Sequence, residues 1–596
     1  MQNYFNYKRR ISAPVQIGSL IMGGDNPIRI QSMTNTSTMD TEASIEQSIR
    51  IIENGGELVR LTAQGVREAQ NLLHIRAGLR DRGYKTPLVA DIHFNPKAAD
   101  AAAKVVEKVR INPGNYVDSV KRFSLIEYTE DEYQQELEKI RERFLPFLSI
   151  CRKNNTAIRI GVNHGSLSDR IMSRYGDTPE GMVESCMEFL RICVEDDFKD
   201  VVISMKASNT LVMVQSVRLL VERMESENIY FPLHLGVTEA GDGEDGRVKS
   251  AVGIGALLAD GIGDTIRVSL SEDPELEIPV AKQLAEYYNI RKDHKFIEGQ
   301  MCDGFNWAKP AKRITNKVMD TGGGSLPVVL TGGSGNISLK PDWCISEDND
   351  RMTTASGAIV GIVNADTYLS EECSTLDPIA LYVYADELTE SLSELLKIRQ
   401  EHTIIILSSR HQNAVGEMRA FIHKLMSYGI NSPVILKLNY QDSDIESVQL
   451  KAGADAGAFF LGGLGDGIWI DAPGINTDSL ISLSFGILQA SRLRVTKTEY
   501  ISCPSCGRTL FDLQKTIARI KEKTSHLKGL KIGIMGCIVN GPGEMADADY
   551  GYVGAGRGMV SLYKKKECIE KNIPAEEAVD RLIDLIKDNG DWKENN

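Results

Sequence analysis

Short apolar and β-branched runs alternate with helix-like stretches through the first 270 residues of the chain. There are eight such runs, each with polar residues at or near its end: residues 28–34, 58–63, 88–94, 109–113, 157–163, 201–208, 232–239 and 264–270. Eight strands alternating with helices are typical of a (β/α)8 barrel, the TIM barrel. The pattern therefore predicts an α/β fold whose N-terminal barrel occupies residues 1–290.

The pattern changes after a helix-like stretch at 276–291. Glycine-rich turns at 322–324 and 332–335 accompany further apolar runs at 327–330, 380–385, 403–408, 433–438 and 457–461. These runs predict a second α/β unit, a degenerate barrel-like insert at 291–494. Its strands do not end in a matching set of cations, and no glycine-rich loop continues into the Lys-Ser/Thr of a phosphate loop. We therefore expect a structural domain.

The last hundred residues, 495–596, predict a small α/β domain. They contain a Cys-Pro-Ser-Cys-Gly sequence, an apolar strand at 531–535, a glycine-rich turn at 541–543 and a closing helix at 575–587.

Composition narrows the class of protein. The 596 residues are 42% hydrophobic and 25% charged, as in an ordinary globular protein. A net charge of −14 argues against nucleic-acid partners, which select a basic footprint. No run reaches the ~18 apolar residues of a membrane helix, and the first ten residues lack the apolar core of a secretory signal. Ten cysteines, mostly scattered, fit a reducing compartment, so we expect a cytoplasmic protein without membrane contact.

Cations recur at the carboxyl ends of the predicted barrel strands, the face where the active sites of such barrels lie. Five strands contribute one each: Arg60, Arg110, Arg159, Lys206 and Arg267. Buried like charges repel and are costly to desolvate, so their convergence indicates a polyanionic ligand, such as a small molecule with two phosphates. The alternative is that each cation pairs with a nearby surface carboxylate.

Other polar side chains lie between these cations, and they could bind hydroxyls or move protons. They are Asp91, His93, Asn112, Asn163, Ser166, Thr238, Glu239 and Ser269. His93 and the neighbouring His164 are weaker candidates, because a lone histidine is more often structural.

Three cysteines stand apart from the scattered ones. Cys503 and Cys506 form a C-x2-C pair, and Cys537 follows about thirty residues later. A closed zinc site needs four Cys or His ligands, and a fourth is not evident, although the pair alone resembles a zinc-ribbon half-site. Three thiolates with one open position suit an iron–sulfur cubane, for which Glu544 is the nearest oxygen ligand. Spacing alone leaves both zinc and iron–sulfur open.

Several sequence motifs of the chain resemble those of a known family, 4-hydroxy-3-methylbut-2-enyl diphosphate synthase. The resemblance covers residues of about 9–290 and 495–560. It is carried by Gln31-Ser-Met-Thr-Asn-Thr, Ala90-Asp-Ile-His-Phe, Arg110-Ile-Asn-Pro-Gly-Asn, Arg159-Ile-Gly-Val-Asn, Gly263-Asp-Thr-Ile-Arg-Val-Ser, Cys503-Pro-Ser-Cys-Gly-Arg and Met535-Gly-Cys-Ile-Val-Asn-Gly-Pro-Gly-Glu.

The resemblance implies a two-electron reduction of 2-C-methyl-D-erythritol 2,4-cyclodiphosphate, with ferredoxin or flavodoxin as the donor. It implies a [4Fe-4S] cluster held by Cys503, Cys506, Cys537 and Glu544. It also assigns the five cations to the diphosphate, helped by Asn163, Thr238 and Ser269, with Asp91 and Asn112 in support. Glu239 becomes the acid near the substrate carbons.

Two features depart from the two-domain members of that family. A lysine run at 564–566 replaces a shorter turn, and we expect a solvated loop there. The insert resembles the middle domain of three-domain members, and without a transit peptide the chain looks bacterial. In two-domain members the cluster domain of one chain caps the barrel of its dimer partner. The sequence leaves open whether this chain caps itself or forms such a homodimer.

Overall fold

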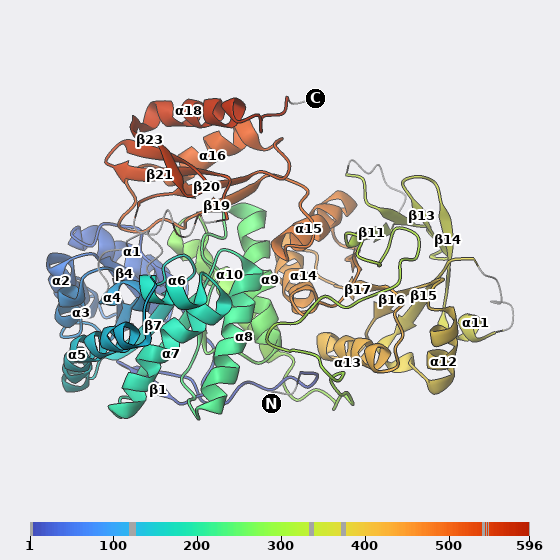
Figure 1. Cartoon of the computed structure of the whole chain (residues 1–596), viewed down its shortest axis with the longest axis horizontal. Coiled ribbons are helices and arrows are strands. Elements are labelled where there is room, and N and C mark those ends of the chain that lie inside the picture. The colour runs from blue at the N-terminus through green and yellow to red at the C-terminus, as the bar shows by residue number, and fades with distance from the viewer. Residues whose placement is uncertain are drawn as a thin grey trace. The chain divides into compact units, whose positions relative to one another are not determined.

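The computed structural model describes residues 4–117, 127–332, 339–370, 377–538, 543, 545 and 547–594. The chain forms two compact units (Figure 1). One, here called the barrel–cap unit, comprises Ile11–Ser250, Gly263–Lys282 and Lys497–Asn596. The other, the insert unit, comprises Met1–Arg10, Ala251–Ile262 and Gln283–Thr496. Among the described helices, none combines the length and apolar character that a membrane span requires.

The barrel–cap unit contains a parallel eight-stranded sheet that forms a barrel. The strand order is β8-β7-β6-β5-β4-β3-β10-β9, and a parallel bridge between Ile203 and Leu233 connects its two ends. The strands are β3 (Arg29–Met33), β4 (Leu58–Ala63), β5 (Leu88–Ile92), β6 (Lys108–Ile111), β7 (Ala157–Asn163), β8 (Val201–Lys206), β9 (His234–Leu235) and β10 (Thr265–Ile266). The predicted TIM barrel is confirmed.

Helices cover the outside of this barrel. They are α1 (Thr41–Glu53), α2 (Val66–Asp81), α3 (Pro96–Ala102), α4 (Pro113–Tyr116), α5 (Glu130–Asn154), α6 (Asp169–Tyr175), α7 (Pro179–Glu195), α8 (Thr210–Ser226), α9 (Gly243–Ala259) and α10 (Glu277–Asn289). Side-chain caps start several of them; Asp40, for example, accepts from the backbone N–H of Ala43. Every residue of β4, β7 and β8 is buried, as expected for parallel strands with helices outside and packed side chains inside.

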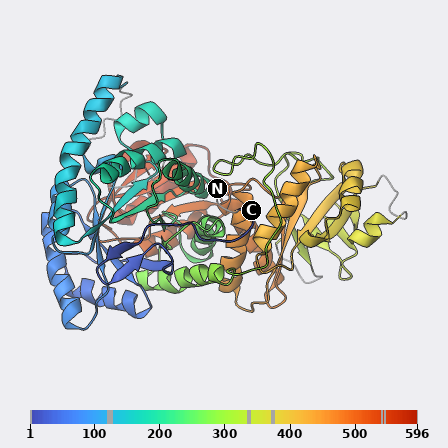
Figure 2. The ribbon, with the colours of Figure 1, turned by 90° about the horizontal axis from the view of Figure 1, so that it is seen from below.

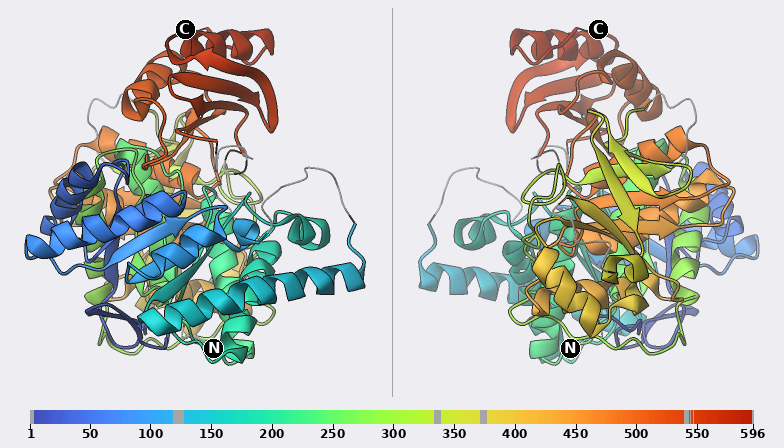
Figure 3. Two further views of the ribbon diagram at one scale, coloured as in Figure 1. Left: turned by 90° about the vertical axis from the view of Figure 1, so that its left-hand side faces the viewer. Right: turned by 90° about the vertical axis from the view of Figure 1, so that its right-hand side faces the viewer.

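The C-terminal domain is a five-stranded sheet with helices packed on it (Figure 3). Its strands are β19 (Glu499–Ser502), β20 (Lys531–Met535), β21 (Tyr550–Gly556), β22 (Met559–Lys564) and β23 (Glu567–Pro574). Strands β19, β20 and β21 pair in parallel. Strand β22 pairs antiparallel with β21, and β23 pairs antiparallel with β22. Helices α16 (Leu513–Thr524) and α18 (Ala575–Asp588) bury their apolar stripes in one core with the sheet. Of the lysine run, Lys564 ends β22, and Lys565 and Lys566 form the exposed turn to β23.

The C-terminal domain is seated on the carboxyl ends of its own chain's barrel strands. The Oγ atoms of Ser271 and Ser502 lie 2.9 Å apart, and the Ser271 hydroxyl lies 3.0 Å from the carbonyl oxygen of Cys503. Backbones approach closely enough to need glycine: a methyl group on Gly165 would overlap the carbonyl of Gly543. These contacts place the cysteine-bearing loops over the barrel mouth.

The insert unit holds a closed barrel of its own (Figure 2). Its strands are β11 (Val328–Gly332), β12 (Trp343–Ile345), β13 (Arg351–Thr354), β14 (Ile359–Val363), β15 (Ile379–Tyr384), β16 (Thr403–Ser408), β17 (Val434–Asn439) and β18 (Gly467–Asp471). Helices α11 (Ala365–Leu369), α12 (Glu390–Arg399), α13 (Ala414–Ser427), α14 (Ile445–Phe460) and α15 (Thr477–Ala490) accompany them. Because β13 pairs antiparallel with both β12 and β14, this barrel departs from the regular parallel pattern.

One predicted strand of the insert is wrong. Residues 457–460 form the end of helix α14 instead, Leu461 is its C-cap, and the strand follows as β18. The small residues of this stretch serve close helix packing: a methyl group on Gly457 would lie 2.5 Å from the carbonyl oxygen of Val252 in α9. An apolar run of five residues fits either element, and here the tertiary contact decides.

Gly165 offers a test of the contact between the C-terminal domain and the barrel. Its φ is +73°, and that of Gly83, on a loop after α2, is +90° with nothing near a new methyl group. Alanine at either position adds backbone strain of about 1–2 kcal/mol. Only Gly165→Ala should displace the C-terminal domain and speed amide hydrogen exchange of residues 502–508. Equal exchange in Gly165→Ala and Gly83→Ala would contradict the described contact.

Candidate active site

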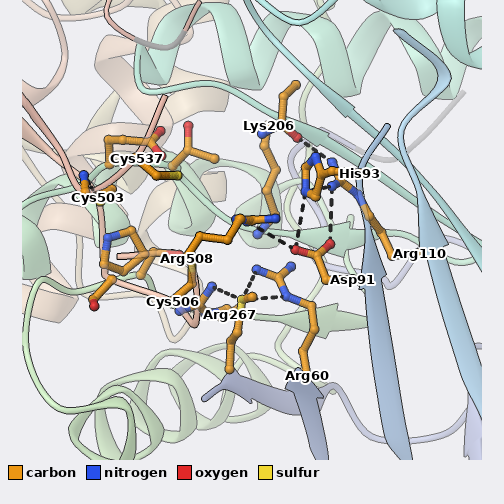
Figure 4. A pocket seen from close by; sticks show the side chains of 18 of the residues that line it. Arg60, Asp91, His93, Arg110, Lys206, Arg267, Cys503, Cys506, Arg508 and Cys537 are labelled. Atoms are coloured by element: carbon orange, nitrogen blue, oxygen red, sulfur yellow. Dashed lines mark hydrogen bonds and ion pairs between the residues drawn. The ribbon is translucent and has the colours of Figure 1, made fainter. Parts of the chain in front are cut away.

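One cavity of the barrel–cap unit lies between the barrel mouth and the C-terminal loops (Figure 4). Its barrel side is lined by Met33, Arg60, Asp91, His93, Arg110, Arg159, Asn163, Lys206, Thr238, Glu239, Arg267 and Ser269. Its other side is lined by Cys503, Pro504, Ser505, Cys506, Arg508, Met535, Gly536 and Cys537. All five predicted cations and all three predicted cysteines therefore face one space.

Asn112 and Ser166, two of the polar residues predicted at the mouth, are absent from this lining. Asn112 does not line the cavity: it caps α4 by accepting from the Gly114 N–H, and its amide nitrogen lies 3.1 Å from Oγ of Ser166. Glu544 lies outside the described residues.

The five cations are buried, and few have a carboxylate partner. Arg267 forms a bidentate pair with buried Glu277, at 2.9 and 3.0 Å. Arg110 lies 3.2 Å from Oδ1 of Asp91. Within the described part of the chain, Arg60, Arg159 and Lys206 have no carboxylate at ion-pair distance; Arg60 points its guanidinium at the sulfur of Met33 instead, at 2.8 Å. Pairing with surface carboxylates, the alternative considered from sequence, does not describe this cluster.

The shortage of nearby negative charge leaves the pKa values of these cations lowered. Burial lowers the pKa of Lys206 well below its ordinary value, and the nearby Arg60 and Arg159 lower it further. Burial and Arg60 do the same to the pKa of Arg159. The pKa of Arg60 falls to about 10, again mainly through burial. An anion bound among these groups would stabilise their charged forms, so the mouth is suited to a polyanion.

Asp91, His93 and Arg110 form a buried network on neighbouring strands. Burial acts to raise the pKa of Asp91, but Arg60, His93 and Arg110 together hold it well below its ordinary value. Burial, followed by the charge of Arg508, lowers the pKa of His93 to about 3, so its ring is neutral near pH 7. Because Nη1 of Arg110 can only donate, the His93 Nε2 atom 2.7 Å away accepts, which leaves the ring proton on Nδ1. His93 thus orients Arg110 toward the cavity.

Glu239 occupies a strained backbone position at the cavity wall. Its φ is +48°, in the left-handed region that non-glycine residues seldom adopt. The preceding Thr238 is anchored by its N–H to the carbonyl of Ala207, at 3.2 Å. Such strain is concentrated at functional sites, and here it holds a carboxyl group at the edge of the cationic mouth.

The three cysteines come from two adjacent strands of the C-terminal sheet. Cys503 follows β19 and Cys537 follows β20; since these strands are parallel, their carboxyl ends meet. Burial raises the pKa of Cys503, and the neighbouring Cys506 and Cys537 sulfurs raise it further. The backbone N–H of Gly536 donates to the Cys503 sulfur at 3.3 Å. Clustered thiols of this kind become thiolates only beside a strong positive charge, such as a metal centre.

The donor set fits an iron–sulfur cluster. Three cysteine sulfurs line one cavity and one of them already accepts a backbone N–H, a contact that tunes such clusters. Among the described residues, no group of three or more Cys, His, Asp or Glu side chains has the geometry of a metal-ion site.

Sequence reasoning did not single out Arg508 or Met33. Arg508 is the cation closest in sequence to the C-x2-C pair, and that position was the available signal. Met33 gave no signal, because a methionine at a strand end is ordinarily a core residue.

The depressed pKa of Lys206 predicts proton uptake when an anion binds. Inorganic pyrophosphate should raise the pKa of Lys206, so binding takes up protons at pH values above the lowered pKa of the unliganded site, and affinity falls as pH rises. Calorimetry in two buffers of different ionisation enthalpy measures the uptake. Lys206→Met should reduce it. Binding heats that do not depend on the buffer would contradict the described electrostatics.

Comparison with known proteins agrees with the geometry. The model of the GcpE TIM-barrel domain matches residues 12–282, and that of the GcpE protein C-terminal domain matches residues 499–588. Distant likenesses to solved barrels, such as a sialic acid synthetase from Leptospira borgpetersenii (TM-score 0.32, 10% identity, 49% of this chain and 94% of that one), carry no argument.

Three relatives carry the name 4-hydroxy-3-methylbut-2-en-1-yl diphosphate synthase (flavodoxin). The protein of Parabacteroides distasonis is 59% identical and that of Phocaeicola vulgatus 60%, each alignment covering 99% of both chains. The protein of Chlorobaculum tepidum is 42% identical over 99% of this chain and 90% of its own. With both family models matched in order and full-length relatives at such identity, the chain belongs to the GcpE family.

Proposed function

We propose that the protein is an iron–sulfur oxidoreductase of isoprenoid biosynthesis, in the methylerythritol phosphate pathway of the bacterial cytoplasm. It converts 2-C-methyl-D-erythritol 2,4-cyclodiphosphate into (E)-4-hydroxy-3-methylbut-2-enyl diphosphate with electrons from flavodoxin. Counted for fully protonated phosphates, two electrons and two protons enter and one water leaves. The observation that carries the proposal is the single cavity that five cations and three cysteines share. The activity named for the full-length relatives supports it, whereas the zinc-knuckle alternative has no such support.

The cations bind the two phosphates. Arginine matches phosphate oxygens with two parallel N–H donors, and Lys206 adds a compact positive charge. Asn163, Thr238 and Ser269, on the same cavity wall, are placed to donate to the remaining oxygens.

The cofactor we propose is a [4Fe-4S] cluster held by Cys503, Cys506, Cys537 and Glu544. When bound, such a cluster supplies electrons one at a time, and an exchangeable carboxylate ligand leaves room for substrate. The described cysteines support the cysteine part of this set. The role of Glu544 is carried by the resemblance of its sequence motif.

The chain's own residues guide the reaction. When the ring opens, negative charge grows on the leaving diphosphate, and Arg110 and Arg159 stabilise it in a site that largely excludes water. Glu239 holds a proton at the cavity wall and delivers it to the substrate, directly or through a water molecule. His93 keeps Arg110 in place during this change.

Turnover with reduced flavodoxin tests the proposal. The purified protein should convert the cyclic diphosphate to the linear product, followed by mass spectrometry. Arg110→Ala removes a charge-assisted phosphate contact, so kcat/KM should fall about 10- to 100-fold. Arg50→Ala, which removes a half-exposed surface guanidinium on α1, is the matched control and should keep wild-type kinetics. An iron-loaded protein that forms no product would contradict the function, and a loss of iron in Arg110→Ala would make Arg110 structural.

Glu544→Ala tests the fourth ligand. The variant should keep a cluster on its three cysteines but show a changed absorption and paramagnetic resonance spectrum, with lower turnover. Glu567→Ala removes an exposed carboxylate of β23 and should change neither. Normal turnover and an unchanged spectrum in Glu544→Ala would reject the ligand role.

A further inference from the structure

Arg508 connects the two sides of the cavity. It follows Cys506 by two residues, belongs to the C-terminal domain, and has a side chain only 8% exposed. Figure 4 shows it extended from the cysteine loops toward Asp91 of the barrel. The Nη2 atom of Arg508 lies 3.7 Å from Oδ2 of Asp91. Among the described residues that line the cavity from the C-terminal domain, Arg508 is the only one with a positively charged side chain.

Arg508 and the three cysteines line the same side of the cavity. Arg508 lines the cavity together with Cys506 and Cys537, and its Nη2 atom lies 3.7 Å from Oδ2 of Asp91 on the barrel side. Its Nε and Nη1 atoms are buried and have no hydrogen-bond partner within the described part of the chain. Two N–H groups of Arg508 can therefore donate hydrogen bonds into the cavity, between the cysteine thiols and the barrel mouth.

The position of Arg508 is fixed from both ends. A methyl group on the preceding Gly507 would lie 2.6 Å from the carbonyl oxygen of Thr36, so this loop packs tightly on the barrel. Asp91 is itself held by Arg110, 3.2 Å away. Moving the guanidinium of Arg508 away from the cysteines would therefore require the contacts between this loop and the barrel to break.

We propose that Arg508 is a positioning residue that couples the seat of the C-terminal domain to the electron affinity of its cluster; this rests on the function proposed above. Its ion pair with Asp91 holds the cysteine loop on the barrel. Its positive charge beside Cys506 and Cys537 favours the reduced cluster, which carries one more negative charge. Asp91 opposes that effect, because its carboxylate partly neutralises the guanidinium.

The test is the midpoint reduction potential of the substrate-free holoenzyme, titrated anaerobically and followed by paramagnetic resonance. Arg508→Gln should shift the potential to more negative values, and Arg508→Lys should recover part of the shift. Asp91→Asn should shift it in the opposite direction. Arg557→Gln removes the same charge from an exposed turn between β21 and β22 and should leave the potential unchanged.

A fully loaded Arg508→Gln protein with the wild-type potential would overturn the proposal, as would a shift of equal size in Arg557→Gln. If Arg508→Gln does not retain iron, Asp91→Asn decides: a positive shift supports the coupling and an unchanged potential rejects it. Failure of the wild-type protein to bind iron and sulfide would instead refute the proposed function.

Discussion

The structure depends on a cluster of buried positive charges that the chain itself only partly neutralises. Arg267 has Glu277 and Arg110 has Asp91, but Arg60, Arg159 and Lys206 face the same cavity without a carboxylate partner in the described part of the chain. Burying cations in this way costs stability, as the lowered pKa values of Lys206 and Arg159 indicate. A protein of net charge −14 has carboxylates to spare, so their absence here marks a place for a bound polyanion.

The C-terminal domain turns this anion site into a candidate redox site. Its seating through Ser271, Gly165 and Gly507 sets three cysteines directly across from the cations. In this arrangement the charged side chains of the barrel mouth are buried, which strengthens the electrostatic interactions between them. Arg508 links the anion site to the cysteines, because it lines the cavity with the thiols and lies within 3.7 Å of the Asp91 carboxylate.

Much of this arrangement follows from local pattern. The strands β4 and β7 were predicted to the residue, since short, mostly apolar runs mark parallel strands buried on both faces, even where Arg60 or Arg159 interrupts them. The five cations were predicted because the fold rule places strand ends at one mouth, and the structure brings them together. Long-range contacts account for the rest. Residues 457–460 are helical, and there Gly457 packs against Val252 of the same unit, whereas Asn112 caps a short helix that the pattern did not reveal. The importance of Arg508 depends on Asp91, more than four hundred residues earlier in the chain.

The most direct measurement is the iron, sulfide and zinc content of the anaerobically purified protein, together with its absorption spectrum. The account predicts about four irons and four sulfides per chain, with a broad charge-transfer band near ~400 nm. One zinc per chain without sulfide would contradict it, because a closed zinc site supplies no electrons and would leave the cationic cavity without a reductive role.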